Sequence, residues 1–333
     1  MVKDMLSGIS VVDCSSLIPG PLCSMMLSDL GAHVTKVEGP QGDRLRFFGG
    51  RKESPYFSVL NREKEIRVLD LKTKRGVSKL QKLIAKADVL ITGTRPGKAA
   101  QLGLSPDHIH KINRKIVHCS ITGYGTKGRE SNKAGHDLNY LARSGVLAVL
   151  SRDYPEVPQV QPADLASGML ACSAILGALF SRAGTGRGMH LDLSMADASS
   201  YFFGMYLAHE ALLGKSDPFL RGKCPCYNLY ETKDGRFVAL GAVEEKFWKN
   251  WCAAVGIPSL LKEQWSLNEQ ILRRVKNEFK GRTAGEWQNL NDTHDFCCEE
   301  VLGPDEAVNL GLRQKKWKLA KGVPFPSSAF GLV

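Results

Sequence analysis

Residues 9–38 read ISVVDCSSLIPGPLCSMMLSDLGAHVTKVE, and this stretch decides the fold class. Ile9–Cys14 is a short apolar run typical of a buried strand, and Gly20–Leu30 has helical spacing. His33–Glu38 is a second strand candidate that ends in an acidic residue. Because a strand, a helix and a strand in this order place both strands parallel in one sheet, we predict a parallel sheet flanked by helices.

The alternation of strand and helix patterns continues through the first half of the chain. Further strands are expected at Ile66–Leu71, Val89–Thr92 and Lys115–Ile121, with a helix over Gly76–Lys86. The uncharged run Leu165–Ser181 is shorter than a membrane span and is interrupted by serine and glycine, so it is expected to form a buried helix. Together these elements predict one α/β domain.

The pattern changes after Ala183. Met189–Leu193 is typical of a strand that leads into a helix, and Arg236–Ala242 is typical of a further strand. From residue 244 to about residue 321 the pattern is mainly helical and rich in charges. A second domain is therefore expected to start near residue 200.

A glycine-rich string at Gly123–Gly128 has the GxGxxG spacing of dinucleotide-binding loops. It follows a strand candidate, but residues 129–135 are polar and typical of a loop, whereas dinucleotide binding needs a helix at this point. The turn of the first unit, Leu17–Pro21, lacks the glycine triplet altogether. The sequence therefore argues against a nicotinamide site.

The charge balance favours an anionic partner. The 333 residues include 45 Lys and Arg against 34 Asp and Glu, which gives a formal net charge of +11. Such a balance suits nucleic acid, an acidic surface or a phosphorylated small molecule. The basic residues are dispersed and no nucleic-acid-binding motif accompanies them, so two interpretations stay open: a solvated basic surface, or a site for a phosphate-rich small molecule.

The cysteines indicate a reducing compartment. There are nine, none of them in a CxxC pair, and several lie within apolar runs, as is typical of reduced thiols. No metal site is expected, because no His or Cys stands at ligand spacing near the closely spaced cysteines. The N-terminal residues lack the pattern of a signal peptide, so a cytoplasmic location is expected.

Three residues combine acid–base chemistry with a position at an element boundary. His136 precedes a helix candidate, Asp164 directly precedes the uncharged helix, and Glu244 follows a strand candidate. Each also has a purely structural interpretation. Asp164 could be an N-cap, His136 a buried histidine with satisfied hydrogen bonds, and Glu244 a first-turn acid favoured by the helix dipole. Spacing alone leaves both interpretations open.

Short segments along most of the chain carry a family resemblance. They are Ile9-Ser-Val-Val-Asp-Cys14, Pro19-Gly-Pro21, Asp29-Leu-Gly-Ala32, Asn61-Arg62, Leu69-Asp-Leu-Lys72 and Arg95-Pro-Gly97. These segments resemble the family III CoA-transferases, the CaiB/BaiF superfamily. Within it, Gly135-His-Asp-Leu-Asn-Tyr140 and Gly241-Ala-Val-Glu-Glu-Lys-Phe247 are similar to the α-methylacyl-CoA racemase branch. The chain departs from the racemases at Gly39, where they often carry an arginine that would meet a CoA phosphate.

The resemblance implies a Rossmann-like large domain over residues 1–200, a smaller α+β domain over 201–320, and a C-terminal segment, 321–333, that returns toward the large domain. It also implies an interlocked homodimer with active sites between subunits. Coenzyme A (CoA) would be part of the acyl-CoA substrate, so no prosthetic group is expected, and neither is a nucleic-acid or membrane partner. The residues it places along the CoA moiety or around the thioester are Leu69, Asp70, Leu71, Lys72, Arg95, Gly135, Asp137, Asn139 and Tyr140.

The resemblance further implies proton transfer at the carbon next to the thioester carbonyl. His136 and Asp164 match the two acid–base residues of the racemase branch, and Glu244 matches the residue that supports the histidine. The α C–H of a thioester is a weak acid, and inversion needs a base on one face and an acid on the other. We therefore expect a racemase or epimerase of 2-methylacyl-CoA thioesters that works by two-base 1,1-proton transfer.

Two alternatives stay open at this point. A CoA-transferase would use Asp164 as a nucleophile and move CoA between carboxylic acids through a mixed anhydride, which leaves His136 without a role. A protein without catalysis would bind CoA esters, or use its basic surface for nucleic acid. The presence of all three acid–base residues and the dispersed charge argue against that second alternative.

Overall fold

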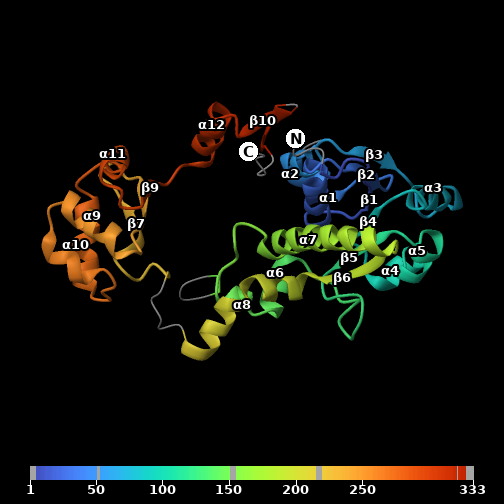
Figure 1. Cartoon of the computed structure of the whole chain (residues 1–333), viewed down its shortest axis with the longest axis horizontal. Helices are drawn as coiled ribbons and strands as arrows, with labels where there is room; N and C mark the ends of the chain where they lie inside the picture. The colour runs from blue at the N-terminus through green and yellow to red at the C-terminus, as the bar shows by residue number, and fades with distance from the viewer. Residues whose placement is uncertain (1–4, 51–52, 151–154, 215–219, 321, 328–333) are drawn as a thin grey trace. The chain divides into compact units, whose positions relative to one another are not determined.

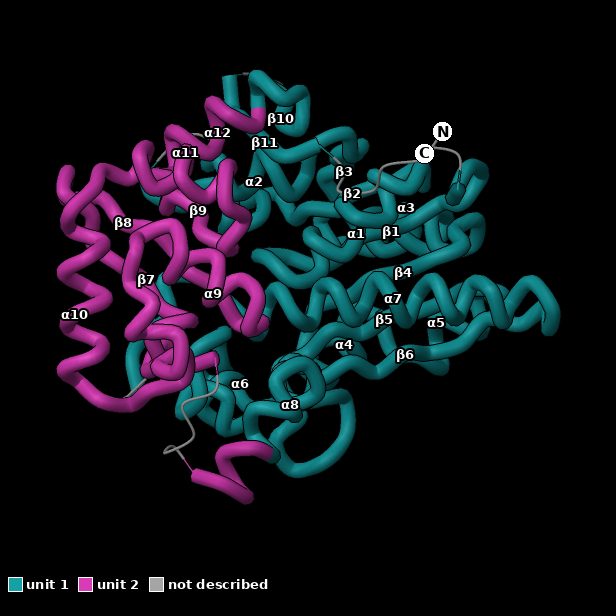
Figure 2. Tube along the Cα trace, turned by 60° about the vertical axis from the view of Figure 1, so that its left-hand side comes forward, with its two compact units in different colours: residues 1–208, 312–333 teal, residues 209–311 magenta. Residues whose placement is uncertain are grey.

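The computed structural model describes residues 5–50, 53–150, 155–214, 220–320 and 322–327 (Figure 1). The chain forms two compact units, drawn in separate colours in Figure 2: unit 1 comprises residues 1–208 and 312–333, and unit 2 comprises residues 209–311. The sequence analysis placed the corresponding boundaries after residues 200 and 320.

Unit 1 is built on a six-stranded parallel sheet with the order β3-β2-β1-β4-β5-β6, which confirms the predicted α/β class. Sequence order runs outward from the centre in both directions, so the order reverses between β1 and β4. In doubly wound sheets the crevice at this switch point, outside the carboxyl ends of the strands, is where ligands bind. The strands are β1 Ser10–Cys14, β2 His33–Glu38, β3 Glu65–Val68, β4 Val89–Thr92, β5 Val117–Thr122 and β6 Met189–Ser194.

Helices cover both faces of this sheet because neighbouring strand residues point to opposite sides. Val11 and Ile91 pack with α1 and α7 on one face, whereas Val12 and Leu90 pack with α3, α4 and α5 on the other. Each face buries a continuous apolar cluster, so unit 1 has three layers. Its helices are α1 Pro19–Asp29, α2 Pro55–Leu60, α3 Lys74–Ile84, α4 Pro96–Gln101, α5 Pro106–Ile112, α6 Asp137–Arg143, α7 Pro162–Thr185 and the greater part of α8 Met195–Leu213.

Most predicted strands that differ from the structure do so by one residue at an end, and the larger differences are in β3 and β5. β3 stops at Val68 instead of Leu71, because its neighbour β2 ends at Glu38, the residue paired with Val68. β5 begins at Val117 instead of Lys115, because Val117 pairs with the first residue of β4. The neighbouring strand therefore determines where each of these strands begins or ends, and the sequence pattern of one strand cannot predict it.

Helix α7 is longer than the predicted run of residues 165–181. It begins at Pro162, since proline suits the first turn, and ends before Gly186, which has φ of +68°. By length and composition alone it could cross a membrane. Ala171 and Ile175, however, are fully buried against α1 and the sheet, and Figure 1 shows α7 lying along the sheet. We therefore assign α7 as the core helix of unit 1.

Unit 2 is a small α+β unit around an aromatic core. Its antiparallel sheet has the order β7-β8-β9, with β7 Tyr227–Glu231, β8 Phe237–Gly241 and β9 Cys298–Glu300. Trp248, Trp251, Trp287 and Phe279 are fully buried, and the Phe279 ring stacks on Tyr230 at a centroid distance of 4.2 Å. The helices are α9 Glu245–Ala254, α10 Glu269–Phe279, α11 Ala284–His294 and most of α12 Pro304–Arg313.

After unit 2 the chain returns to unit 1 as a hairpin. Its strands are β10 Trp317–Ala320 and β11 Val323–Pro326. β11 packs against α2, and the Arg62 guanidinium lies 5.2 Å from the centroid of the Phe325 ring. Residues 321 and 328–333 of the expected C-terminal segment lie outside the described residues.

Candidate active site

A cavity of about 560 Å³ lies at the switch point of the unit 1 sheet. Its floor is formed by the segments that directly follow three neighbouring strands: Ser15–Leu17 after β1, Gly93–Arg95 after β4, and Gly123 after β5. All of these segments belong to unit 1. The sheet order therefore brings parts of the chain that are far apart in sequence to one site.

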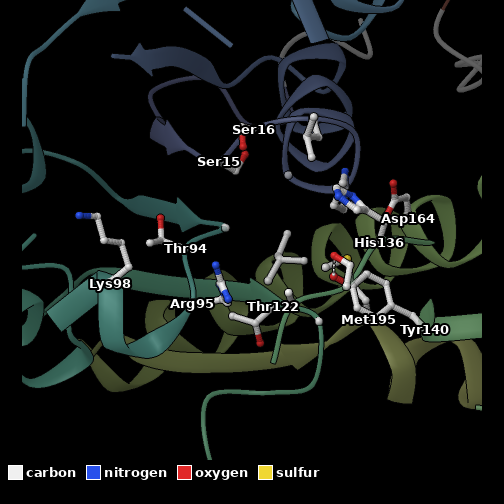
Figure 3. A pocket seen from close by; sticks show the side chains of 18 of the residues that line it. Ser15, Ser16, Thr94, Arg95, Lys98, Thr122, His136, Tyr140, Asp164 and Met195 are labelled. Atoms are coloured by element: carbon white, nitrogen blue, oxygen red, sulfur yellow. Dashed lines mark hydrogen bonds between the residues drawn. The ribbon is translucent and has the colours of Figure 1, made fainter. Parts of the chain in front are cut away.

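His136 and Asp164 both line this cavity, and Figure 3 shows them on the same side of it. His136 occupies the position before α6, where its backbone N–H donates to Asn139 Oδ1 at 3.0 Å. The His136 side chain is exposed rather than packed in the core. The interpretation of this residue as a satisfied buried histidine is therefore wrong.

Asp164 is the third residue of α7, and Gln161 occupies the N-cap position, so Asp164 is not an N-cap. No donor among the residues that the structure describes hydrogen-bonds the Asp164 carboxylate. Burial, followed by the nearby Asp137 carboxylate, raises the pKa of Asp164 to about 7. A carboxyl group with this pKa both holds and releases a proton near neutral pH, which suits an acid–base catalyst.

Asp137 fastens the start of α7 to the start of α6. Its Oδ1 accepts the backbone N–H of Asp164 at 3.0 Å, and it also accepts the backbone N–H of Ala163. Asp137 is itself buried, and burial raises its pKa. Because Asp137 occupies these amides at the start of α7, they are not free to bind a substrate oxygen. A helix dipole lowers the pKa of a carboxylate near the N-terminus of the helix. At Asp164, burial and the Asp137 carboxylate raise the pKa and have the larger effect.

Tyr140 lines the cavity beside His136 and Asp164. Its hydroxyl donates to the Gly135 carbonyl at 2.5 Å, and burial raises its pKa to about 12, so it stays protonated at neutral pH. A Cβ on Gly135 would lie 2.7 Å from the Tyr140 ring. A larger residue at position 135 would therefore displace the tyrosine, which explains the need for glycine there.

A second cavity of about 550 Å³ adjoins the first and shares Ser15, Ser16, Thr94 and Lys98 with it. The predicted CoA-contact segment Leu69–Lys72 lines this second cavity. Apolar side chains complete the wall, namely Val37, Leu102 and Leu104. The two cavities therefore meet at four polar residues, and the second is lined by both apolar and charged side chains.

Buried charges hold the loop that the two cavities share. The side chains of Asp13, Lys36 and Lys64 are fully buried. Lys36 Nζ donates to the Ser15 carbonyl at 2.7 Å, and Lys64 Nζ donates to Ser24 Oγ at 2.7 Å and lies 3.5 Å from Asp13 Oδ2. Burial opposes ionisation of Asp13, but the two ammonium groups outweigh it and hold the Asp13 pKa well below its usual range. Burial also lowers the pKa of Lys64 to about 8.

The same cluster fixes an unusual backbone conformation. Leu17 has φ of +66°, which is unfavourable for a residue with a side chain. Its N–H donates to Asp43 Oδ1 at 3.2 Å, and the other Asp43 oxygen lies 3.1 Å from Lys36 Nζ. The shape of the loop between β1 and α1 therefore depends on groups buried beneath it.

Residues 6–318 match a single family model, described as CoA-transferase family III. The chain belongs to CoA-transferase family III. It is 35% identical to the human alpha-methylacyl-CoA racemase over 314 residues, which cover 91% of this chain and 79% of the racemase. It is 34% identical to the mouse succinyl-CoA:glutarate CoA-transferase over 268 residues, which cover 78% of this chain and 61% of the transferase.

The structure is also similar to a solved member of the family. A CAIB/BAIF family protein from Brucella suis superposes with a TM-score of 0.85 at 25% sequence identity, covering 98% of this chain and 92% of that one. The predicted family and fold are thus confirmed. Since both racemases and transferases are among its relatives, membership of family III establishes an enzyme of this family and leaves the reaction to be argued from the site.

Apart from Leu69–Lys72 in the second cavity, the predicted site residues of this family III enzyme fall into three groups. Arg95, Gly135 and Tyr140 line the first cavity together with His136 and Asp164. Asp137 and Asn139 lie beside His136 and Asp164 but do not line either cavity, and both bind neighbouring backbone groups. Glu244 lies in unit 2 at the N-cap of α9 without a side-chain capping bond, so its predicted support of His136 stays a prediction.

Sequence reasoning missed the polar residues at the junction of the two cavities. Ser15, Ser16, Thr94 and Lys98 were not among the predicted CoA contacts, although each follows the end of a β1 or β4 candidate closely. The rule that ligands bind at the carboxyl ends of parallel strands was the available signal. It becomes specific only when the strand order, and so the neighbourhood of β1 and β4, is known.

Proposed function

We propose that this family III enzyme is an isomerase that racemises or epimerises 2-methylacyl-CoA thioesters by proton transfer at the α-carbon. The observation that carries the proposal is the pair His136 and Asp164 in one cavity, with the pKa of Asp164 raised to about 7. A general base and a general acid work best when their pKa lies near the working pH. The similarity to the human alpha-methylacyl-CoA racemase supports the same assignment.

In the proposed reaction one enantiomer loses its α-proton to His136 and receives a proton from Asp164 on the opposite face. The other enantiomer reacts in the reverse direction. The thioester oxygen gains negative charge in between, so hydrogen-bond donors in the cavity would stabilise the enolate. Tyr140 keeps its proton at neutral pH and fixes the Gly135 backbone beside the reacting groups. The CoA moiety would extend past Arg95 into the second cavity, along Leu69–Lys72.

NMR of a chiral 2-methylacyl-CoA in D₂O tests this proposal directly. With the enzyme, we expect the α-proton signal to disappear as the optical activity is lost, because each inversion exchanges the α-proton with solvent. A control with heat-inactivated enzyme should show neither change. Retention of both the α-proton and the optical activity, in a protein that binds CoA, would contradict the isomerase proposal.

The second candidate is a CoA-transferase, which the similarity to the mouse succinyl-CoA:glutarate CoA-transferase favours. Asp164 would then attack the thioester carbonyl, releasing CoA thiolate and leaving an acyl group on its carboxylate. A nucleophilic carboxylate must be ionised, and the raised pKa of Asp164 disfavours that state below neutral pH. Hydroxylamine trapping of an acyl group on Asp164 would identify this reaction.

We further propose that the enzyme is a homodimer, because helices α7 and α8 leave large apolar side chains in solvent. Phe180 is 85%, Tyr201 75% and Met205 69% exposed. Soluble monomers rarely expose apolar side chains in groups, and a second copy of the chain would cover them. Size-exclusion chromatography with light scattering should give twice the chain mass, and Tyr201→Glu combined with Met205→Glu should shift it to the monomer. A stable wild-type monomer with full activity would contradict this assembly.

A further inference from the structure

Among the residues that the structure describes, one charged residue lines both cavities. This residue is Lys98, on helix α4, at the junction formed with Ser15, Ser16 and Thr94. Ala99, the next residue along the helix, is buried in the core cluster, and its packing there holds α4 in position. Figure 3 shows Lys98 at the opposite end of the first cavity from His136 and Asp164.

The reactive carbon, the diphosphate and the nucleotide of a CoA thioester follow one another in the same order as the first cavity, the junction and the second cavity. The reactive carbon and the nucleotide are separated by the pantetheine arm, and a diphosphate joins that arm to the adenosine. With the α-carbon at His136 and Asp164, the nucleotide would fall in the second cavity and the diphosphate at the junction. We propose that Lys98 binds this diphosphate, an inference that rests on the proposed use of an acyl-CoA substrate.

The charges around the junction support this role. Two of the three carboxylates that line the second cavity are neutralised, since Glu38 binds Arg46 at 2.7 Å and Asp43 binds Lys36 at 3.1 Å. The third, Asp70, accepts the backbone N–H of Lys72 at 3.0 Å. In contrast, no described carboxylate lies within ion-pair distance of Lys98. Position 39, on the same wall, holds a glycine and contributes no cation. The diphosphate therefore meets an available ammonium group from α4 at the junction.

Isothermal titration of the full-length protein with CoA and with dephospho-CoA tests the assignment. Both ligands carry the diphosphate, so Lys98→Ala should weaken binding of both by about 10- to 100-fold, the range expected for hydrogen bonds to a charged group. Lys98→Arg keeps the positive charge and should recover most of the affinity. The matched control is Lys111→Ala, an exposed lysine on α5 that lines neither cavity and whose removal should leave both affinities unchanged.

Each other outcome contradicts the proposal in a distinct way. Unchanged affinity of Lys98→Ala for CoA, with wild-type protein binding CoA, would overturn the role of Lys98 and leave the proposed function intact. A loss for CoA without a loss for dephospho-CoA would assign Lys98 to the 3′-phosphate and overturn the diphosphate contact. Wild-type protein that binds neither ligand would overturn the proposed function and this inference together. An unchanged melting temperature of Lys98→Ala will show that the variant is folded.

Discussion

His136→Ala and Asp164→Ala are each expected to lose nearly all racemisation of a chiral 2-methylacyl-CoA, while each keeps α-proton exchange of one enantiomer. Inversion needs both groups, so removal of either should lower its rate by about 10²- to 10⁴-fold. The remaining group still faces one side of the α-carbon and still exchanges that proton with solvent. NMR in D₂O, started separately from each pure enantiomer, should show complementary deuterium uptake by the two variants.

The pH dependence of the exchange should identify the remaining base. In His136→Ala, Asp164 must be ionised to remove a proton, and burial with Asp137 raises its pKa to about 7. The exchange rate should therefore rise with pH and level off above about pH 7. A variant lacking His136 that still racemises both enantiomers would contradict the two-base mechanism. Trapping of an acyl group on Asp164, together with no α-deuterium incorporation by the wild-type enzyme, would also contradict the two-base mechanism.

Asp13→Ala is expected to lower the free energy of unfolding of unit 1 by about 3–5 kcal/mol, the cost of breaking a buried ion pair. Without this carboxylate, the buried Lys64 loses its counter-charge, and Lys36 keeps only its ion pair with Asp43. Ser15 and Ser24 lose the acceptor of their hydroxyl hydrogen bonds as well. Urea unfolding followed by far-UV circular dichroism measures the loss.

The tryptophans provide an internal control for this measurement. Four of the five, at positions 248, 251, 265 and 287, lie in unit 2, so fluorescence mainly follows unit 2. We expect the fluorescence transition to move less than the dichroism transition in Asp13→Ala. Asp107→Ala, at an exposed first-turn position of α5, should cost less than about 1 kcal/mol. A loss in Asp13→Ala no larger than this control would show that the buried cluster does not stabilise the unit.

The strands of unit 1 were predictable because parallel strands that are buried on both faces have continuous apolar sequences. His33–Glu38 and Val89–Thr92 have the predicted bounds. The end of β3 was not predictable, since it depends on where β2 stops. Helix α7 was predicted as buried but too short, because its ends are set by Pro162 and Gly186 outside the uncharged run.

The candidate site was predictable only in part. Local motifs singled out His136 and Asp164, which the structure brings into one cavity. The junction residue Lys98 carries no such motif, and its importance arises from the strand order that joins β1 and β4. The raised pKa of Asp164 comes first from burial and then from Asp137, whose side chain reaches α7 from another helix. The residue spacing within one segment cannot predict a contact between two helices.

The return of the chain to unit 1 has a consequence for folding during synthesis. Unit 2, residues 209–311, is continuous, so all of its chain is available once its last residue has left the ribosome. The lining of the first cavity ends at Met195 and is made even earlier. Unit 1 itself stays unfinished until β11 reaches α2 and Phe325 meets Arg62. Nascent chains stalled before residue 322 should therefore carry a complete catalytic floor on a domain whose last hairpin is still missing.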